Sequence, residues 1–125
     1  KTPLEEAARI MADRKIGGLP VMQGPDLVGI ITETDLFKAL LELFGGRRSG
    51  VRVTVTVPVE KGVLSKITTA IFQAGGDIVG LGMKGILGSY GDTAEVVLKV
   101  QGVERDALVA ALRPVVKEVV DVREV

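Results

Sequence analysis

The sequence predicts an α+β fold in two parts, and three observations carry this prediction. Residues 1–44 show the order helix, strand, strand, helix, with the turn Gly24-Pro25-Asp26 between the strands. Residues 45–50 are rich in glycine and are typical of a linker. Residues 51–125 show the order strand, helix, strand, strand, helix, strand, which is that of a ferredoxin-like unit. We therefore expect one domain at 1–44, a linker at 45–50 and a second domain at 51–125.

The first helix has a clear start signal in the sequence. Thr2 suits the N-cap position, Pro3 suits the first helical position, and Glu5 completes a capping box. Apolar residues at helical spacing then give the helix one buried face: Leu4, Ala7, Ala8 and Met11. Strands are expected after it at about 16–22 and 27–31.

Polar groups lie at the junction between the second strand and the second helix, and their role can be interpreted in two ways. Thr32 ends the strand and Asp35 follows three residues later, which is close to a capping box. The same helix terminus has backbone N–H groups without helical partners, and these attract anions. A hydroxyl at Thr32 would then serve a phosphate, and a carboxylate at Asp35 would serve a ribose diol. The residues leave both interpretations open.

The second part begins with a strand that has one apolar face. Valines alternate with polar residues over 51–59, and Pro58 is expected near the strand end, where no ladder donor is needed. Hydrophobic spacing and glycine or proline breaks predict the other elements: a helix at 63–74 ended by Gly75-Gly76, strands at 78–85 and 94–100 around a glycine-rich loop, a short helix around 108–112 ended near Pro114, and a strand at 119–125. We expect an antiparallel sheet with two helices on one face and a partly apolar opposite face.

The composition excludes several classes of function. The chain has no cysteine and no histidine, so disulfides, the usual zinc sites and nucleophile–histidine catalysis are excluded. Sixteen basic and sixteen acidic residues balance, and aromatic residues are scarce, so we expect no nucleic-acid partner. No apolar run is long enough to span a bilayer. We expect a cytoplasmic, non-catalytic protein without a membrane partner, a metal or a required cofactor.

The segment from Gly80 to Gly85 matches the spacing G-x-G-x-x-G of dinucleotide-binding loops. That motif requires a helix directly after it and an acidic residue about twenty positions later. The residues that follow, 86–91, have the composition of a loop, so we reject a dinucleotide site here. Glycines in this strand are expected to allow close backbone approach or a bulge.

The first 44 residues resemble a cystathionine-β-synthase (CBS) motif. The resemblance rests on the order of elements and on these residues: Ala7, Met11, Gly18, Leu19, Pro20, Val21, Gly29, Thr32 and Asp35. It implies a regulatory site for an adenine nucleotide or adenosyl compound, with phosphate at Thr32 and ribose at Asp35. The resemblance further implies that these residues line the site: Thr2, Ile16, Gly18, Leu19 and Pro20.

Residues 51–125 resemble an ACT domain, on the element order and on the residues around the first helix of this part. Gly62 lies in the loop before that helix, and Asp77 with Ile78 begins the next strand. The resemblance implies a tentative amino-acid effector site at these three residues. The family often has asparagine where this chain has Asp77, and an ionised carboxylate can only accept hydrogen bonds. We therefore expect ordinary amino acids to bind poorly here.

A CBS motif followed by an ACT domain resembles the acetoin-utilisation type of regulatory protein. The chain lacks the strand that normally opens a CBS motif, so we expect a fragment that begins inside the last of a pair of such motifs. The resemblance implies a homodimer that senses a small-molecule effector, with a link to acetoin metabolism. Two alternatives stay open: an amino-acid sensor in the second part, or a module that serves only dimerisation.

Overall fold

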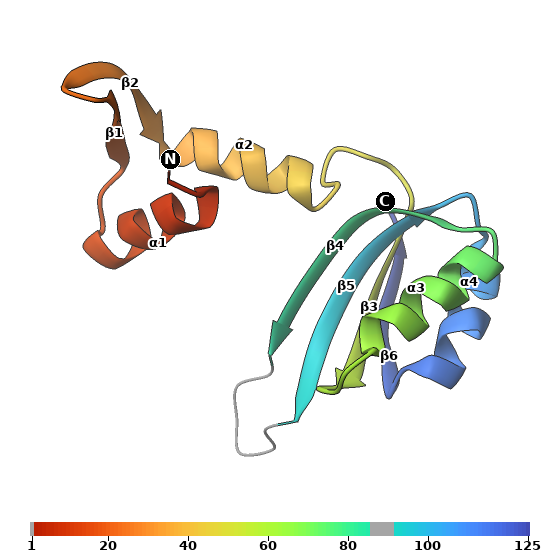
Figure 1. Cartoon of the computed structure of the whole chain (residues 1–125). Coiled ribbons are helices and arrows are strands. Elements are labelled where there is room, and N and C mark those ends of the chain that lie inside the picture. The colour runs from red at the N-terminus through yellow and green to blue at the C-terminus, as the bar shows by residue number, and fades with distance from the viewer. Residues whose placement is uncertain (1, 86–91) are drawn as a thin grey trace. The chain divides into compact units, whose positions relative to one another are not determined.

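The computed structural model describes residues 2–85 and 92–125, and it confirms the predicted α+β class. The chain divides into two compact units, Lys1–Glu42 and Leu43–Val125. We call them the N-terminal unit and the C-terminal unit, and each is described by itself (Figure 1). No helix among the described residues is long and apolar enough to cross a membrane.

The N-terminal unit is a β-hairpin flanked by two helices (Figure 1). Its elements follow the predicted order: α1 (Leu4–Arg14), β1 (Gly18–Gln23), β2 (Asp26–Thr32) and α2 (Glu33–Leu43). The strands pair antiparallel around the predicted turn, in which Gly24 has a positive φ of 60°. Gly18 pairs with Thr32 at the open end of the hairpin.

The start of α1 differs from the prediction by one residue. Pro3, and not Thr2, is the N-cap, with an extended backbone (φ −62°, ψ 153°) and no side-chain cap. The carbonyl of Pro3 accepts hydrogen bonds from the amides of Glu6 and Ala7, both at 3.1 Å. The capping box expected from Thr2 and Glu5 was therefore wrong. Pro3 has no backbone N–H that needs an acceptor, and its ψ is already extended, as is typical of a cap residue. The helix therefore begins after Pro3 without a capping hydroxyl.

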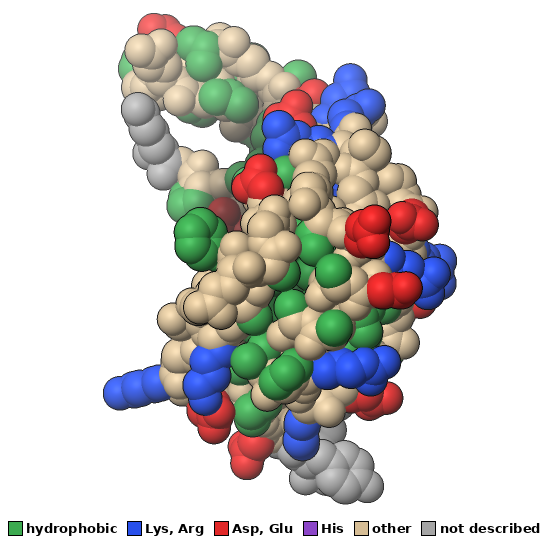
Figure 2. Space-filling view, turned by 90° about the vertical axis from the view of Figure 1, so that its right-hand side faces the viewer, with side chains coloured by type: hydrophobic (Ala, Val, Ile, Leu, Met, Phe, Trp, Pro, Cys, Tyr) green, Lys and Arg blue, Asp and Glu red, His purple; other side chains and the backbone are tan. Residues whose placement is uncertain are grey.

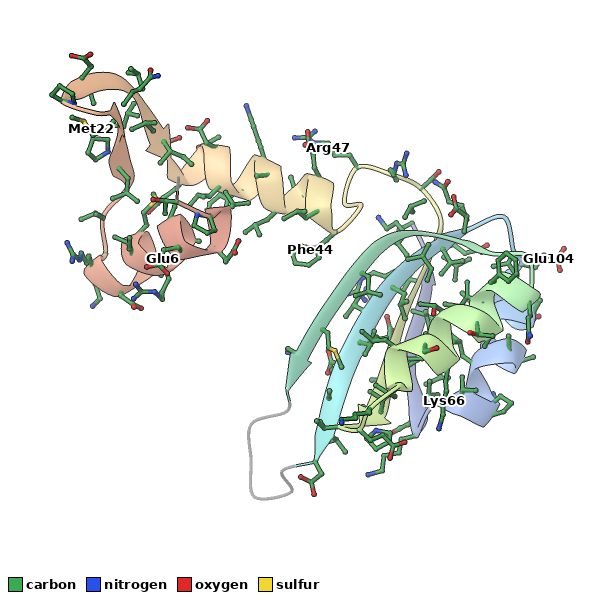
Figure 3. All side chains as sticks on the ribbon, in the orientation of Figure 1. Glu6, Met22, Phe44, Arg47, Lys66 and Glu104 are labelled. Carbon is green, nitrogen blue, oxygen red and sulfur yellow. The ribbon has the colours of Figure 1, made fainter. Side chains whose placement is uncertain are left out.

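The core of the N-terminal unit is small. Only Ala7, Met11 and Leu36 form its buried cluster among the described residues, with a few half-buried neighbours. The hairpin instead exposes its apolar side chains on both faces, and Leu27 and Ile30 each keep 67% of their surface exposed. Met22, near the tip of the hairpin in Figure 3, is also exposed.

The C-terminal unit is a four-stranded antiparallel sheet with two helices on one face (Figure 1). Its strand order is β4-β5-β3-β6. The elements are β3 (Val51–Pro58), α3 (Val63–Gln73), β4 (Asp77–Gly85), β5 (Thr93–Gln101), α4 (Arg105–Leu112), a 3-10 turn (Arg113–Val115) and β6 (Glu118–Glu124). This is the predicted β-α-β-β-α-β order.

The main core lies between this sheet and its two helices. Valines of β3 alternate inward as predicted, and Val53, Val55 and Val57 are fully buried. Branched residues of α3 and α4 cover them, including Ile67 and Leu108. Burial of each such side chain contributes roughly 1.5–3 kcal/mol of stability. The C-terminal unit therefore gains more hydrophobic stabilisation than the N-terminal unit.

The opposite face of the sheet was predicted to be partly apolar. The structure shows that it is more polar than this. The outward positions of β3 are Arg52, Thr54 and Thr56, and charged residues of β5 and β6 lie beside them in the strand register. Figure 2 is turned so that the other side of the C-terminal unit, which carries α3 and α4, faces the viewer, and there acidic and basic side chains are interspersed with hydrophobic ones. The predicted loop at 85–92 falls almost entirely outside the described residues.

Candidate functional site

The hairpin and α2 bring three of the predicted nucleotide-binding residues together. Gly18 on β1 lies opposite Thr32 on β2, and the amide of Glu33 donates to the carbonyl of Gly17 at 3.2 Å. This bond ties the entry of β1 to the start of α2. Asp35, in the first turn of α2, is bonded to Thr32. A glycine, a hydroxyl and a carboxylate therefore meet at one helix N-terminus.

Thr32 and Asp35 form a reciprocal cap. The carboxylate oxygen Oδ2 of Asp35 accepts from the backbone amide of Thr32 at 2.8 Å and from its hydroxyl at 2.9 Å. The amide of Asp35 donates to the hydroxyl oxygen of Thr32 at 3.3 Å. The carboxylate thus turns back onto its own helix, as the capping interpretation requires. The second oxygen, Oδ1, accepts no hydrogen bond from the described residues and remains available.

The cap sets the charge state of Asp35. Hydrogen bonds from the backbone amide and then from the hydroxyl of Thr32 lower the pKa of the Asp35 carboxyl, and the positive charge of Lys38 adds to the effect. These bonds favour the charged form because an ionised carboxylate is the better acceptor. Asp35 is therefore an anion at neutral pH, fixed in one position.

The other predicted residues of this site are more scattered. Thr2 precedes α1 and is exposed. Ile16 is exposed between α1 and β1, where its amide donates to the carbonyl of Met11 at 3.1 Å. Leu19 packs against the small core, and Pro20 is exposed opposite Ile30. Leu19 therefore has a structural role of its own, while Ile16 and Pro20 are free to contact a ligand.

The three residues of the tentative effector site lie at two ends of one helix. Gly62 is the N-cap of α3 with a φ of 83°, whereas Asp77 follows the C-terminus of α3 and begins β4. An 11-residue helix is about 16 Å long. Ile78 packs against the core. Gly62 and Asp77 therefore cannot share one small ligand within a single chain, and a joint site would need a second copy.

The segment predicted to be a linker is bound to the sheet of the C-terminal unit. The ammonium of Lys99 donates to the carbonyls of Gly45 at 2.7 Å and Arg48 at 2.8 Å. The amide side chain of Gln101 donates to the carbonyl of Ser49 at 2.6 Å. Residues 45–50 are thus held by specific bonds, although their composition is that of a flexible connection.

Two glycines of the rejected G-x-G-x-x-G motif have the predicted packing role. The motif lies within β4 and not at a strand-to-helix turn. A Cβ atom on Gly80 would come within 2.1 Å of the carbonyl oxygen of Phe44, and one on Gly82 within 3.0 Å of the Phe44 ring. A register shift between Ile78 and Gly80 confirms the expected bulge. The glycines let the segment after α2 lie directly on the strand.

Lys99 is the residue that the sequence prediction missed. Only 8% of its surface is exposed, on a strand that is otherwise mostly buried. Lys99 stands in the apolar run Val97-Leu98-Lys99-Val100, which indicates a buried strand. Because a lysine is seldom fully buried without a partner, its unusual position could have been recognised from the sequence. Its partners, the carbonyls of Gly45 and Arg48, are more than fifty residues away in sequence and carry no sequence signal. Among the described residues, no three acidic side chains gather as a metal-ion site.

Comparison with known proteins supports the resemblance of the first part of the chain to a CBS motif. Residues 1–42 match the family described as the CBS domain. Inosine-5'-monophosphate dehydrogenase from Thermoplasma acidophilum is 53% identical over 36 residues, which are 29% of this chain and 7% of that enzyme. The chain thus spans a small fraction of that relative, and so short a match does not transfer its activity. CBS domains are regulatory modules, so the match favours a regulatory role.

Among solved structures, the chain is similar to protein BT0572 from Bacteroides thetaiotaomicron. The similarity covers 99% of this chain and 84% of that one, with 19% identity and a TM-score of 0.39. A TM-score of this size supports no argument about fold or function. The ACT assignment of residues 51–125 and the link to acetoin utilisation stay predictions.

Proposed function

We propose that this chain is a regulatory module whose N-terminal unit binds an adenine nucleotide or an adenosyl compound. The observation that carries the proposal is the meeting of Gly18, Thr32 and Asp35 at the N-terminus of α2. The match of residues 1–42 to the CBS domain, a family of regulatory modules, supports it independently.

The ribose is the part of the ligand for which the geometry offers most. Oδ2 of Asp35 is held by Thr32, so the carboxylate is fixed before a ligand arrives. Oδ1 remains to accept from a ribose hydroxyl, and hydrogen bonds to a charged acceptor are among the stronger ones. A fixed acceptor also loses little conformational freedom on binding.

The phosphate would bind beside Thr32, where it has to compete with the cap. The hydroxyl of Thr32 donates to Asp35, and the amides of Thr32, Glu33 and Asp35 are already bonded. A phosphate at this position would accept a hydrogen bond from the Thr32 hydroxyl. The hydroxyl would then give up its hydrogen bond to Asp35. The positive end of the α2 dipole favours that exchange.

The base would lie along the entry of β1. Gly18 has no side chain, and Ile16 and Pro20 on either side of it are exposed apolar surfaces. A Cβ atom on Gly18 would meet the Ile30 side chain and the carbonyl oxygen of Ile31, each at 3.3 Å. The missing side chain therefore lets β1 and β2 approach closely at this point, and the base would lie on the exposed surfaces of Ile16 and Pro20.

Calorimetric titration of the full chain with AMP, ATP and S-adenosylmethionine tests this proposal. Gly18→Ala is the site variant and Gly29→Ala is its control, because a Cβ atom on Gly29 meets nothing within 4 Å. We expect saturable binding that Gly18→Ala weakens and Gly29→Ala leaves unchanged. Equal binding by both variants would show that the base does not bind beside β1. A lack of binding by all three ligands would refute the proposal.

Dimerisation without a ligand is the second candidate function, and the exposed apolar side chains of the N-terminal unit favour it. Val28, Ile30 and Phe37 are each more than half exposed. A buried cluster of three residues is small for an independent unit. A second subunit would cover these side chains, and we propose a homodimer for both candidate functions.

A further inference from the structure

The open face of the C-terminal sheet carries a row of three positive charges. In the strand register, Arg52 on β3 lies opposite Lys99 on β5 and opposite Arg123 on β6. Directly opposite side chains have Cβ atoms about 5 Å apart, and like charges at that spacing destabilise a sheet. A row of this kind therefore needs anionic partners.

The described residues provide one carboxylate for the row. Oδ2 of Asp121 accepts from Nε of Arg123 at 2.9 Å and lies 3.7 Å from Nη1 of Arg52. Lys99 has no carboxylate within 4 Å among residues 2–85 and 92–125, although it is the most buried of the three cations. Its two acceptors are neutral carbonyls, while an ammonium has three donors.

A hollow of about 500 Å³ begins at this row, and it lies entirely within the C-terminal unit. Arg52 and Lys99 are among the residues that line it. Phe44, Met83 and Val97 add apolar lining, and the Phe44 ring packs closely over Gly82. Figure 3 shows Phe44 directly after the end of α2. Lys84 and Glu95 also line the hollow; they lie opposite each other in the register of β4 and β5, and their charges sum to zero.

We propose that this hollow binds a small monocarboxylate with an apolar body. The carboxylate would accept from Arg52, whose planar guanidinium suits a two-oxygen acceptor, and would offset the charge of Lys99. The apolar body would lie against Val97 and Phe44. The volume is within the range of ordinary small-ligand sites. This site is separate from the nucleotide site and does not depend on it.

The proposal is tested with hexanoate as the probe, using calorimetry and amide chemical shifts of the full chain. We expect saturable binding that shifts the signals of Arg52, Val97 and Lys99. The neutral isostere hexanamide should bind at least about tenfold more weakly, since it lacks a charge-assisted bond. Arg52→Gln should weaken hexanoate to a similar degree, whereas Arg105→Gln, on the helix face, should leave it unchanged.

Two further measurements make the result decisive. Arg52→Gln removes a repulsion from Lys99 and Arg123 but also the contacts of Arg52 with Asp121 and Thr54, so the melting temperature of the variant is measured beside its binding, and a loss of binding by a variant that stays folded does not reflect misfolding. Phe44→Ala, at an exposed wall residue, should weaken hexanoate while leaving its dependence on salt unchanged. Equal binding of hexanamide, equally tight binding of inorganic phosphate, shifts confined to other surfaces, or no saturable binding would each overturn the proposal.

Discussion

Lys99 and Arg52 face each other across β5 and β3, two cations in one register position, and only Lys99 is buried. Backbone carbonyls of the segment after α2 make this possible, because they accept two bonds from the ammonium. The burial of Lys99 therefore depends on residues 45–50, which supply the carbonyls that accept from its ammonium.

Lys99→Met should release that segment. The variant keeps most of the side-chain volume but removes the ammonium donor from the carbonyl of Arg48 and one of the two donors from the carbonyl of Gly45, which keeps its bond from the Arg48 amide. Loss of hydrogen bonds from a charged donor costs about 1–3 kcal/mol, so thermal unfolding should occur at a lower temperature. Hydrogen exchange at amides 45–50 should become faster. Unchanged exchange there would show that other bonds hold the segment.

Gly80→Ala should be poorly tolerated. The added methyl would come within 2.1 Å of the carbonyl oxygen of Phe44, and backbone cannot move aside as a side-chain end can. Overpacking of this kind costs about 1–3 kcal/mol. Gly85→Ala, on the same strand with nothing within 4 Å, is the matched control. Equal melting temperatures for the two variants would show that Phe44 does not lie on β4 in solution.

The pH dependence of stability should carry a signature of Asp35. Its pKa is lowered on folding, so the unfolded chain binds the proton more readily between the two pKa values. The stabilisation is present above the ordinary pKa of about 4 and is lost as pH falls through the folded pKa.

Asp35→Asn separates this effect from the other carboxylates, since its amide oxygen still accepts in the cap but does not titrate. Unfolding midpoints of both proteins should converge as the solution becomes more acidic. Parallel curves at all pH values would contradict the cap geometry.

The chain should form a homodimer. Light scattering coupled to size exclusion should give twice the subunit mass at micromolar concentration. Ile30→Glu places a charge among the exposed apolar side chains of the hairpin and should shift the equilibrium toward monomer, while Gly29→Ala should not. A monomer at high micromolar concentration would contradict this expectation.

Local patterns predicted most of the fold, because helix and strand periodicity and glycine breaks are written along the chain. The valines of β3 and the glycines that end α3 are examples, and their elements agree with the structure within a few residues. The cap of α1 was missed because hydroxyl and proline signals competed at adjacent positions. Such boundaries differ by a residue or two for small energetic reasons.

The arrangement of the sites depended on pairing, which the sequence does not encode locally. Thr32 and Asp35 were identified because three-residue spacing fixes their contact. Arg52 and Lys99 are 47 positions apart, and only the strand register brings them together. Residues 45–50 likewise have the composition of a free linker, and their restraint comes from side chains far along the chain.

The central claim is nucleotide binding at the N-terminus of α2, and amide chemical shifts during titration of the full chain with AMP test it most directly. We expect saturable shifts centred on Gly18, Thr32 and Asp35, with small changes at Gly29 and in the C-terminal sheet. AMP at ten times its dissociation constant should also stabilise the fold by about 1.4 kcal/mol. A folded chain whose signals at these three residues do not move with AMP, ATP or S-adenosylmethionine would contradict the claim, and Asp35 would then serve only as a helix cap.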